Sequence, residues 1–125
     1  MSGRRDESLP LDEILDASSR LIELGARTPP GMLGLDRDIN EMVMFNLLKL
    51  GEASKRLRPE TRVRFSDVDW SAMARIRDRV AHHYEQLNWV LVSEIIEEDL
   101  PALVPRLAEI RDLLRAEFDA QAGEQ

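Results

Sequence analysis

Apolar residues recur at helical spacing along nearly the whole chain, and no stretch sustains the alternation of apolar and polar residues that marks a strand. A first helix is predicted over residues 10–26, with Pro10 allowed in its opening turn. The segment 28–34 contains two prolines and two glycines and predicts a loop. A second helix is predicted over residues 36–57. It is apolar around much of its circumference, which is typical of a helix that is buried centrally or shared with a partner chain.

The second half of the chain is also predicted to form helices separated by short breaks. Arg58-Pro59 ends the second helix, and residues 59–66 predict a polar connection. A third helix starts near Asp67 or Asp69, either of which could cap it. Asn88 can cap a short fourth helix, and residues 99–101 predict a restart into a last helix that reaches about residue 120. The expected fold class is all-α, an antiparallel up-and-down helical bundle of four main helices plus a short one.

Length and composition fit a single globular domain. The 125 residues are 43% hydrophobic and 33% charged, which is too apolar for a disordered chain. The helical bundle is expected over residues 10–120, between a flexible N-terminal tail at 1–9 and a frayed C-terminal tail at 121–125. The chain has no cysteine, which excludes disulfides and thiolate metal sites, and no apolar run approaches a membrane span. A cytoplasmic protein is therefore expected.

Charge is distributed unevenly along the chain. The net charge of −7 at first argues against nucleic acid, because phosphate binding rests on lysine and arginine. Residues 55–79, however, hold 8 basic and 4 acidic side chains, whereas residues 1–54 and 80–125 carry net charges of −4 and −7. The basic side chains of this island are Lys55, Arg56, Arg58, Arg62, Arg64, Arg75, Arg77 and Arg79. The island could attract phosphate or could be an ordinary solvated surface with chance clustering.

The candidate chemistry follows directly after the basic island. The only two histidines, His82 and His83, are adjacent, and the only tyrosine is Tyr84. Histidine exchanges protons near neutral pH, and an arginine such as Arg77 grips phosphate through two parallel donors. Arg77 and Tyr84 share a helix face at a separation of seven residues, but Arg77 and His82, five apart, do not. The alternative is that the histidine pair interacts with the last carbonyls of its helix.

Metal binding is a poor explanation of the histidine pair. Two adjacent histidines point in different directions on a helix, and no His-x-x-x-His or Glu-x-x-His spacing occurs. Neither a metal nor another cofactor is therefore expected.

The pattern Arg77-x4-His82-x-Tyr84 resembles the signature of the HepT-like toxin ribonucleases, a branch of the HEPN superfamily. The flanking segments look like that family in order and spacing: Leu50-Gly51-Glu52-Ala53, Trp70, Arg77-Asp78 with His82-His83-Tyr84, and Ile95-Ile96-Glu97-Glu98-Asp99-Leu100-Pro101. The chain departs from the family pattern at Glu85 and Asn88, where members often have an aromatic residue and an aspartate.

The resemblance implies a toxin that dimerises so that both motifs line one cleft, and that cleaves RNA without a metal. Arg77 and His82 are the implied catalytic residues, and Asp78 is the polar residue that follows the arginine. Tyr84 is the implied site at which a small nucleotidyltransferase antitoxin of the MntA type attaches adenylate and switches the toxin off. The expected partners are a second copy of the chain, this antitoxin and RNA, without a membrane and without DNA.

Two copies of His82 in one cleft would supply both the base and the acid that cleavage at an RNA 2′-hydroxyl requires. His83 is expected to tune the cleft. Arg75 and Arg79 are expected to draw in RNA, with surface solubility as the alternative. Glu52 lies in an apolar helix, where a charge needs a partner, and it is expected to orient an arginine of the motif, with a solvated helix residue as the alternative. Gly51 is expected to allow close helix packing. The tryptophans and three of the methionines are expected in the core or at an interface: Trp70, Trp89, Met42, Met44 and Met73.

Two other functions are compatible with the same residues. The first is a non-catalytic HEPN-like scaffold that binds the nucleotidyltransferase and presents substrate to it, which suits the acidic outer segments and the very apolar second helix. The second is a nucleotide-binding or stress-signalling bundle, for which the sequence offers no positive feature. Toxicity of the chain in the absence of its partner separates the ribonuclease from the scaffold.

Overall fold

Every regular element in the described part of the chain, residues 5–123 of the computed structural model, is a helix. The elements are α1 (Ser8–Arg27), α2 (Arg37–Arg56), α3 (Pro59–Arg64), α4 (Trp70–His83), a 3-10 turn η1 (Tyr84–Gln86), α5 (Trp89–Glu94), a π-helical segment η2 (Ile95–Asp99) and α6 (Leu100–Gly123). The predicted all-α class is confirmed.

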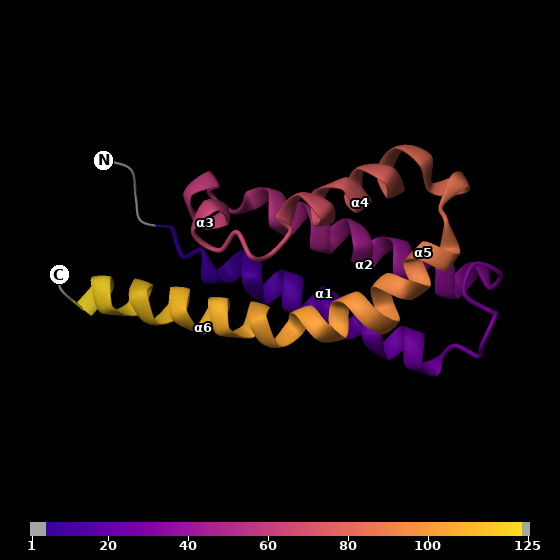
Figure 1. The fold of residues 1–125 in the computed structure, drawn as a ribbon, viewed down its shortest axis with the longest axis horizontal. Helices are drawn as coiled ribbons and strands as arrows, with labels where there is room; N and C mark the ends of the chain where they lie inside the picture. Colours follow the sequence, from indigo (N-terminus) through magenta and orange to yellow (C-terminus); the bar gives the residue numbers. More distant parts are fainter. Residues whose placement is uncertain (1–4, 124–125) are drawn as a thin grey trace.

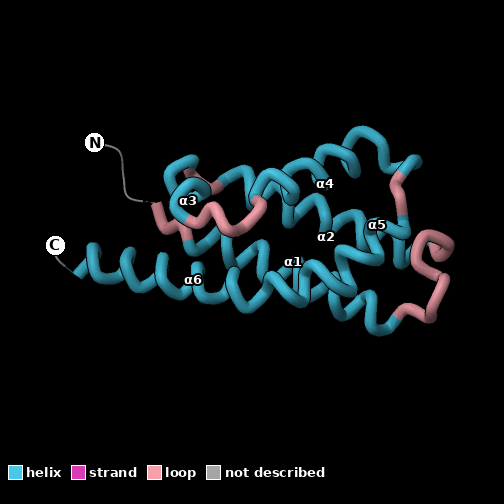
Figure 2. The backbone as a smooth tube through the Cα atoms, viewed as in Figure 1, coloured by secondary structure: helices cyan, strands magenta, loops and turns pink. Residues whose placement is uncertain are grey.

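The four long helices run alternately in opposite directions along the molecule (Figure 1). Helix α2 packs against both α1 and α4, and α6 packs against α1. The α1–α2 loop and the α4–α5 connection lie at one end of the bundle, and α3 lies at the other (Figure 2). This arrangement confirms the predicted up-and-down bundle, and it places the end of α4 beside the start of α5.

The core is built from the apolar stripes of the four long helices. Its fully buried members include Leu11, Ile14, Leu21, Val43, Leu47, Leu107 and Ile110. Burying each such side chain stabilises the fold by about 1.5–3 kcal/mol. Of the large residues read as core or interface, Trp70 and Met73 are buried, Met44 and Trp89 are partly buried, and Met42 is 43% exposed.

Three helices begin at side chains that accept a hydrogen bond from a free backbone N–H. Asp36 accepts from the N–H of Ile39 at the start of α2, and Asn88 accepts from Leu91 at the start of α5. Asp69, rather than Asp67, caps α4 by accepting from Ala72. Each cap satisfies one of the four backbone donors that an α-helix leaves unpaired at its N-terminus.

The segment predicted as a connection, residues 59–66, contains the short helix α3. Pro59 occupies the first turn of α3, where its missing N–H costs nothing. Glu7 is buried and accepts hydrogen bonds from Arg58 N at 2.7 Å and Thr61 Oγ1 at 2.9 Å. Helix α3 is therefore tied to the N-terminal end of α1.

Both ends of the predicted domain differ from the structure. Helix α1 begins at Ser8, which is fully buried, although residues 1–9 were assigned to a tail. Helix α6 continues to Gly123, past the predicted end near residue 120. Residues 1–4 and 124–125 of the two expected tails lie outside the described residues.

The restart predicted at residues 99–101 is wrong, because α5, η2 and α6 follow one another without a break. A proline ring clashes with the carbonyl four residues earlier in an α-helix. The π-helical turn before Pro101 has wider bonds, from Leu100 N–H to Ile95 O, and accommodates the ring without ending the helix. Gly25 of α1 makes room for this wider segment, since a Cβ there would lie 2.5 Å from Ile96 Cγ2.

None of the helices within residues 5–123 combines the length and apolar composition needed to span a bilayer.

Candidate functional site

Helices α2 and α4 pack in close contact at Gly51. A Cβ atom at this position would lie 2.1 Å from Arg77 Cβ and 2.7 Å from the backbone oxygen of Met73. Real side chains do not come this close, so only glycine permits this crossing. The close packing expected for Gly51 is present, and it brings Arg77 against the surface of α2.

Arg77 is held by carboxylates from two helices. Its Nε lies 2.5 Å from Glu52 Oε1, although the N–H is not aligned for a hydrogen bond, and its Nη1 donates to Asp78 Oδ1 at 3.1 Å. Asp78 also accepts from Lys55 Nζ at 2.7 Å. The pairing of Glu52 with a motif arginine, expected from the sequence, is therefore present. Nη2 of Arg77 makes neither a hydrogen bond nor an ion pair within residues 5–123.

Two cationic neighbours stabilise the charged form of Asp78. The hydrogen bond from the Lys55 ammonium, and then the one from Arg77, hold the pKa of Asp78 below its ordinary value of 3.8. An ionised Asp78 at neutral pH keeps its attraction for Arg77. Lys55 was counted only as part of the basic island, and its place in this network depends on the α2–α4 crossing.

A groove of about 590 Å³ lies between α4 and the segment formed by α5 and η2. From α4 it is lined by Ala72, Arg75, Ile76, Asp78, Arg79, His82 and His83, and from the other side by Leu91, Ile95 and Asp99. The structure thus brings five of the sequence-predicted site residues into one groove. Arg77, Glu52 and Tyr84 do not line it. Arg77 is connected to this groove through the hydrogen bond that it donates to Asp78, which lines the groove.

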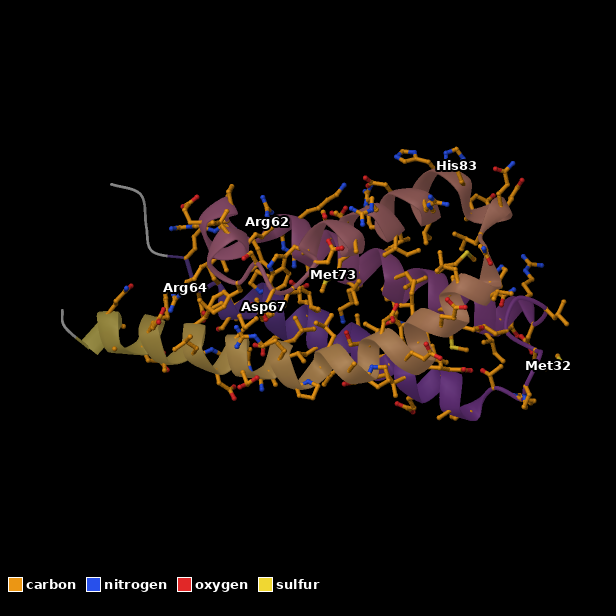
Figure 3. All side chains as sticks on the ribbon, viewed as in Figure 1. Met32, Arg62, Arg64, Asp67, Met73 and His83 are labelled. Carbon is orange, nitrogen blue, oxygen red and sulfur yellow. The ribbon has the colours of Figure 1, made fainter. Side chains whose placement is uncertain are left out.

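The histidine pair lies on the surface at the last turn of α4. Both side chains are exposed, and His83 is seen at the outer edge of α4 in Figure 3. Within residues 5–123 neither imidazole makes a hydrogen bond or an ion pair, so bonding to the last helix carbonyls does not occur. Tyr84 opens the turn η1 and is 55% exposed. Both imidazoles and the phenol are therefore accessible to a ligand.

The two arginines of the groove differ in their partners. Arg75 donates to Ser71 Oγ at 3.1 Å and lies 3.7 Å from an Asp69 oxygen. Arg79 has no ion pair or side-chain hydrogen bond in the described part of the chain. It also lines a second hollow of about 310 Å³ with His83, Gln86 and Leu87. Arg79 therefore presents an uncompensated positive charge between two neighbouring hollows.

Residues 5–123 contain no group of three or more histidine, aspartate or glutamate side chains that could hold a metal ion.

Comparison with known protein families identifies the family to which this chain belongs. Residues 14–110 match the family described as Ribonuclease HepT-like, and this match covers most of the chain. The chain belongs to the HepT-like ribonuclease family. The resemblance found from the motif is thereby confirmed at the level of the family.

Relatives of this HepT-like chain come from archaea and bacteria. A candidate RNase of Methanocaldococcus jannaschii is 26% identical over 109 residues, which is 80% of this chain and 92% of the relative. A second candidate RNase of the same organism is 31% identical over 75 residues, 60% of this chain and 62% of the relative. A candidate ribonuclease HepT of Thermococcus cleftensis is 29% identical over 62 residues, 50% of this chain and 56% of the relative. The chain thus spans less than two thirds of two of these three relatives.

No solved structure matches this HepT-like chain at a significant level. The matched range includes every residue of the groove and of the Arg77 network. Sequence reasoning missed the groove residues Leu91, Ile95 and Asp99. Their spacing of four residues was the available signal, because it places them along one side of a helical segment.

Proposed function

We propose that this HepT-like protein is a metal-independent endoribonuclease, the toxin of a toxin–antitoxin pair. The observation that carries the proposal is the grouping of Arg75, Arg79, His82 and His83 along one groove, linked through Asp78 to an oriented Arg77. Permanent positive charge and exposed imidazoles are the two features that phosphodiester cleavage needs without a metal.

The proposed reaction uses the nucleophile that RNA carries. One His82 imidazole takes the proton of a 2′-hydroxyl, and the oxygen attacks the adjacent phosphorus. A protonated imidazole gives its proton to the 5′-oxygen as the P–O bond breaks, which leaves a 2′,3′-cyclic phosphate and a free 5′-hydroxyl. Arg77, through its uncommitted Nη2, stabilises the negative charge that gathers on the phosphoryl oxygens.

We propose a homodimer because one chain supplies only one His82. The outer face of α2 suits the contact, since Phe45 is 64% exposed and Met42 43% exposed on it. Both line a hollow that also carries the basic Arg20 and Lys49 and the acidic Asp16. A surface with both charges and an apolar centre can pair with a copy of itself about a twofold axis.

A nucleotidyltransferase antitoxin of the MntA type is the proposed partner, and Tyr84 is its proposed target. The phenol is more than half exposed and makes no hydrogen bond within residues 5–123, so it is free to accept adenylate. Each adenylate adds a phosphodiester charge near His82 and His83. This charge would repel RNA in the same way that phosphorylation repels an anionic ligand.

The proposal is tested by inducing the chain alone in a bacterial host and analysing the RNA. Wild type is expected to arrest growth and cleave RNA, and the purified protein is expected to cleave in excess chelator. His82→Ala and Arg77→Ala are expected to lose both effects while remaining folded dimers. Arg37→Ala is the matched control, because its side chain is 89% exposed and belongs neither to the groove nor to the Arg77 network.

The rival function is a non-catalytic scaffold that binds the nucleotidyltransferase. Normal growth and intact RNA for wild type and all variants, with every protein folded, would reject the ribonuclease in favour of this scaffold. The exposed apolar face of α2 would then be a surface for that partner.

A further inference from the structure

The two walls of the groove beside α4 have opposite character. The α4 wall carries the guanidinium groups of Arg75 and Arg79, and Arg79 has no ion pair or side-chain hydrogen bond in the described residues. Asp78 lies on the same wall, but its charge is paired with Lys55 and Arg77. The opposite wall carries two apolar side chains, Leu91 and Ile95, and one carboxylate, Asp99. A ligand that fills the groove must therefore be anionic on one side and flat or apolar on the other.

The π-helical segment η2 places the carboxylate in the groove. Ile96 and Leu100 are buried against the bundle, whereas Ile95 and Asp99, four residues apart, face the groove. Asp99 is exposed and has no ion pair or side-chain hydrogen bond within residues 5–123. Glu52 and Asp78 are paired with cations, whereas Asp99 offers both oxygens to a ligand.

A nucleotide has the shape and polarity of this groove. The volume of about 590 Å³ is in the range of small-molecule sites. The phosphate is attracted to Arg75 and Arg79 and repelled by Asp99, which fixes the direction of the nucleotide. A base bound in this direction would contact Ile76 of α4 and the apolar side chains of the other wall and would turn its edge toward Asp99, since all of these line the groove.

A carboxylate can discriminate among the four RNA bases by the number of adjacent N–H donors that each base presents on its Watson–Crick edge. Guanine is the only one that presents two adjacent N–H donors on its Watson–Crick edge, N1–H and the exocyclic amine, and these match the two oxygens of a carboxylate. Adenine and cytosine present one amine beside an acceptor, and uracil presents one N–H between two acceptors. An acceptor facing a carboxylate is left unpaired and repelled.

We propose that the groove between α4 and η2 is a base-binding subsite for single-stranded RNA, and that Asp99 selects guanine in it. This inference rests on the proposed function, because it names the base beside the bond that the same site would cut. Single-stranded RNA exposes the base edge that Asp99 would read, whereas a duplex hides it in pairing.

The test measures binding without cleavage. The probes are 2′-O-methyl uridine hexamers with guanine, adenine or cytosine at one central position, which lack the free hydroxyl that cleavage requires. The guanine hexamer is expected to bind wild type about tenfold more tightly than the adenine hexamer, the scale of one bidentate base contact. Asp99→Asn is expected to abolish this preference, because its amide replaces one acceptor with a donor.

Glu98→Gln is the matched control, since it removes the same charge from an exposed neighbour that does not line the groove. It is expected to keep the guanine preference. Equal binding of the three hexamers, a preference that survives in Asp99→Asn, or no binding at all would overturn the inference. Cleavage of unmodified RNA is measured in parallel. Cleavage without a base preference would reject the guanine subsite and leave the proposed ribonuclease activity standing. Guanine binding that depends on Asp99, without any cleavage, would reject the ribonuclease activity and leave the subsite standing.

Discussion

At the scale of single residues, the placement of Arg77 depends on its neighbours more than on its own position in the motif. Glu52 and Asp78 hold two of its nitrogens, and Lys55 donates a hydrogen bond to Asp78 that lowers the pKa of this carboxyl. An arginine with free rotamers would lose conformational entropy each time it bound a phosphate. The contacts with Glu52 and Asp78 already restrict the Arg77 side chain, so Glu52 is a positioning residue in the proposed reaction.

Glu52→Gln is expected to lower kcat for RNA cleavage by about tenfold or more, because a small misplacement of a catalytic group has large kinetic effects. The pair is half-buried and glutamine keeps a side-chain oxygen beside Arg77, so the free energy of unfolding is expected to change by less than about 1 kcal/mol. Cleavage kinetics and urea unfolding measure the two quantities. Glu41→Gln, an exposed carboxylate near the start of α2, serves as control, and an unchanged kcat in Glu52→Gln would refute the positioning role.

At the scale of elements, the crossing of α2 and α4 and the short helix α5 decide how the groove is built. The crossing depends on the missing side chain of Gly51. Helix α5 is the first stretch of the continuous helix that runs through η2 into α6, and it begins at the Asn88 cap. Asparagine caps a helix about as well as aspartate does, so Asn88 is a strong cap at this position.

Gly51→Ala is expected to destabilise the protein by about 1–3 kcal/mol, because the added methyl meets Arg77 Cβ and a backbone carbonyl, neither of which can rotate away. Denaturant unfolding measures the change. Gly123→Ala is the control, since a Cβ there meets nothing within 4 Å. Equal stabilities of Gly51→Ala and wild type would show that the helices can separate without cost.

Asn88→Ala is expected to lower the free energy of unfolding by about 1 kcal/mol, because the N–H of Leu91 loses its acceptor. Asn88→Asp is expected to stay within a few tenths of a kcal/mol of wild type, since aspartate keeps that acceptor. Thermal and urea unfolding of the two variants measure the difference. An aspartate variant as unstable as the alanine variant would show that the cap does not stabilise α5.

At the scale of the whole molecule, ion pairs join helices that are distant in sequence. Arg64 of α3 bonds Glu117 of α6, and Arg106 of α6 bonds Asp67 before α4. The hydrogen bond from Arg106 lowers the pKa of Asp67, and the one from Arg64 lowers the pKa of Glu117. Each lowered pKa means that the folded state favours the charged carboxylate.

Stability is therefore expected to depend on acid pH. The contribution of these carboxylates is fully present above their ordinary pKa values of 3.8 and 4.5, and it is lost as pH falls through the lowered values of the folded state. Urea unfolding between neutral pH and about pH 3 measures the slope. Arg106→Gln is expected to flatten it, because Asp67 loses its cation, and an unaltered slope would contradict the assignment.

The sequence by itself determined the helical class, most of the helix starts and the family, because these depend on periodicity, caps and a motif within short stretches of chain. Only the tertiary structure decided that α3 forms where a loop was expected, and that a π-helical turn carries the chain through Pro101. It also brought Glu52 to Arg77 and Asp99 into the groove with His82. Helical periodicity fixes neighbours three and four residues apart, whereas residues 17 to 25 positions apart meet only where packed helices and their connections place them.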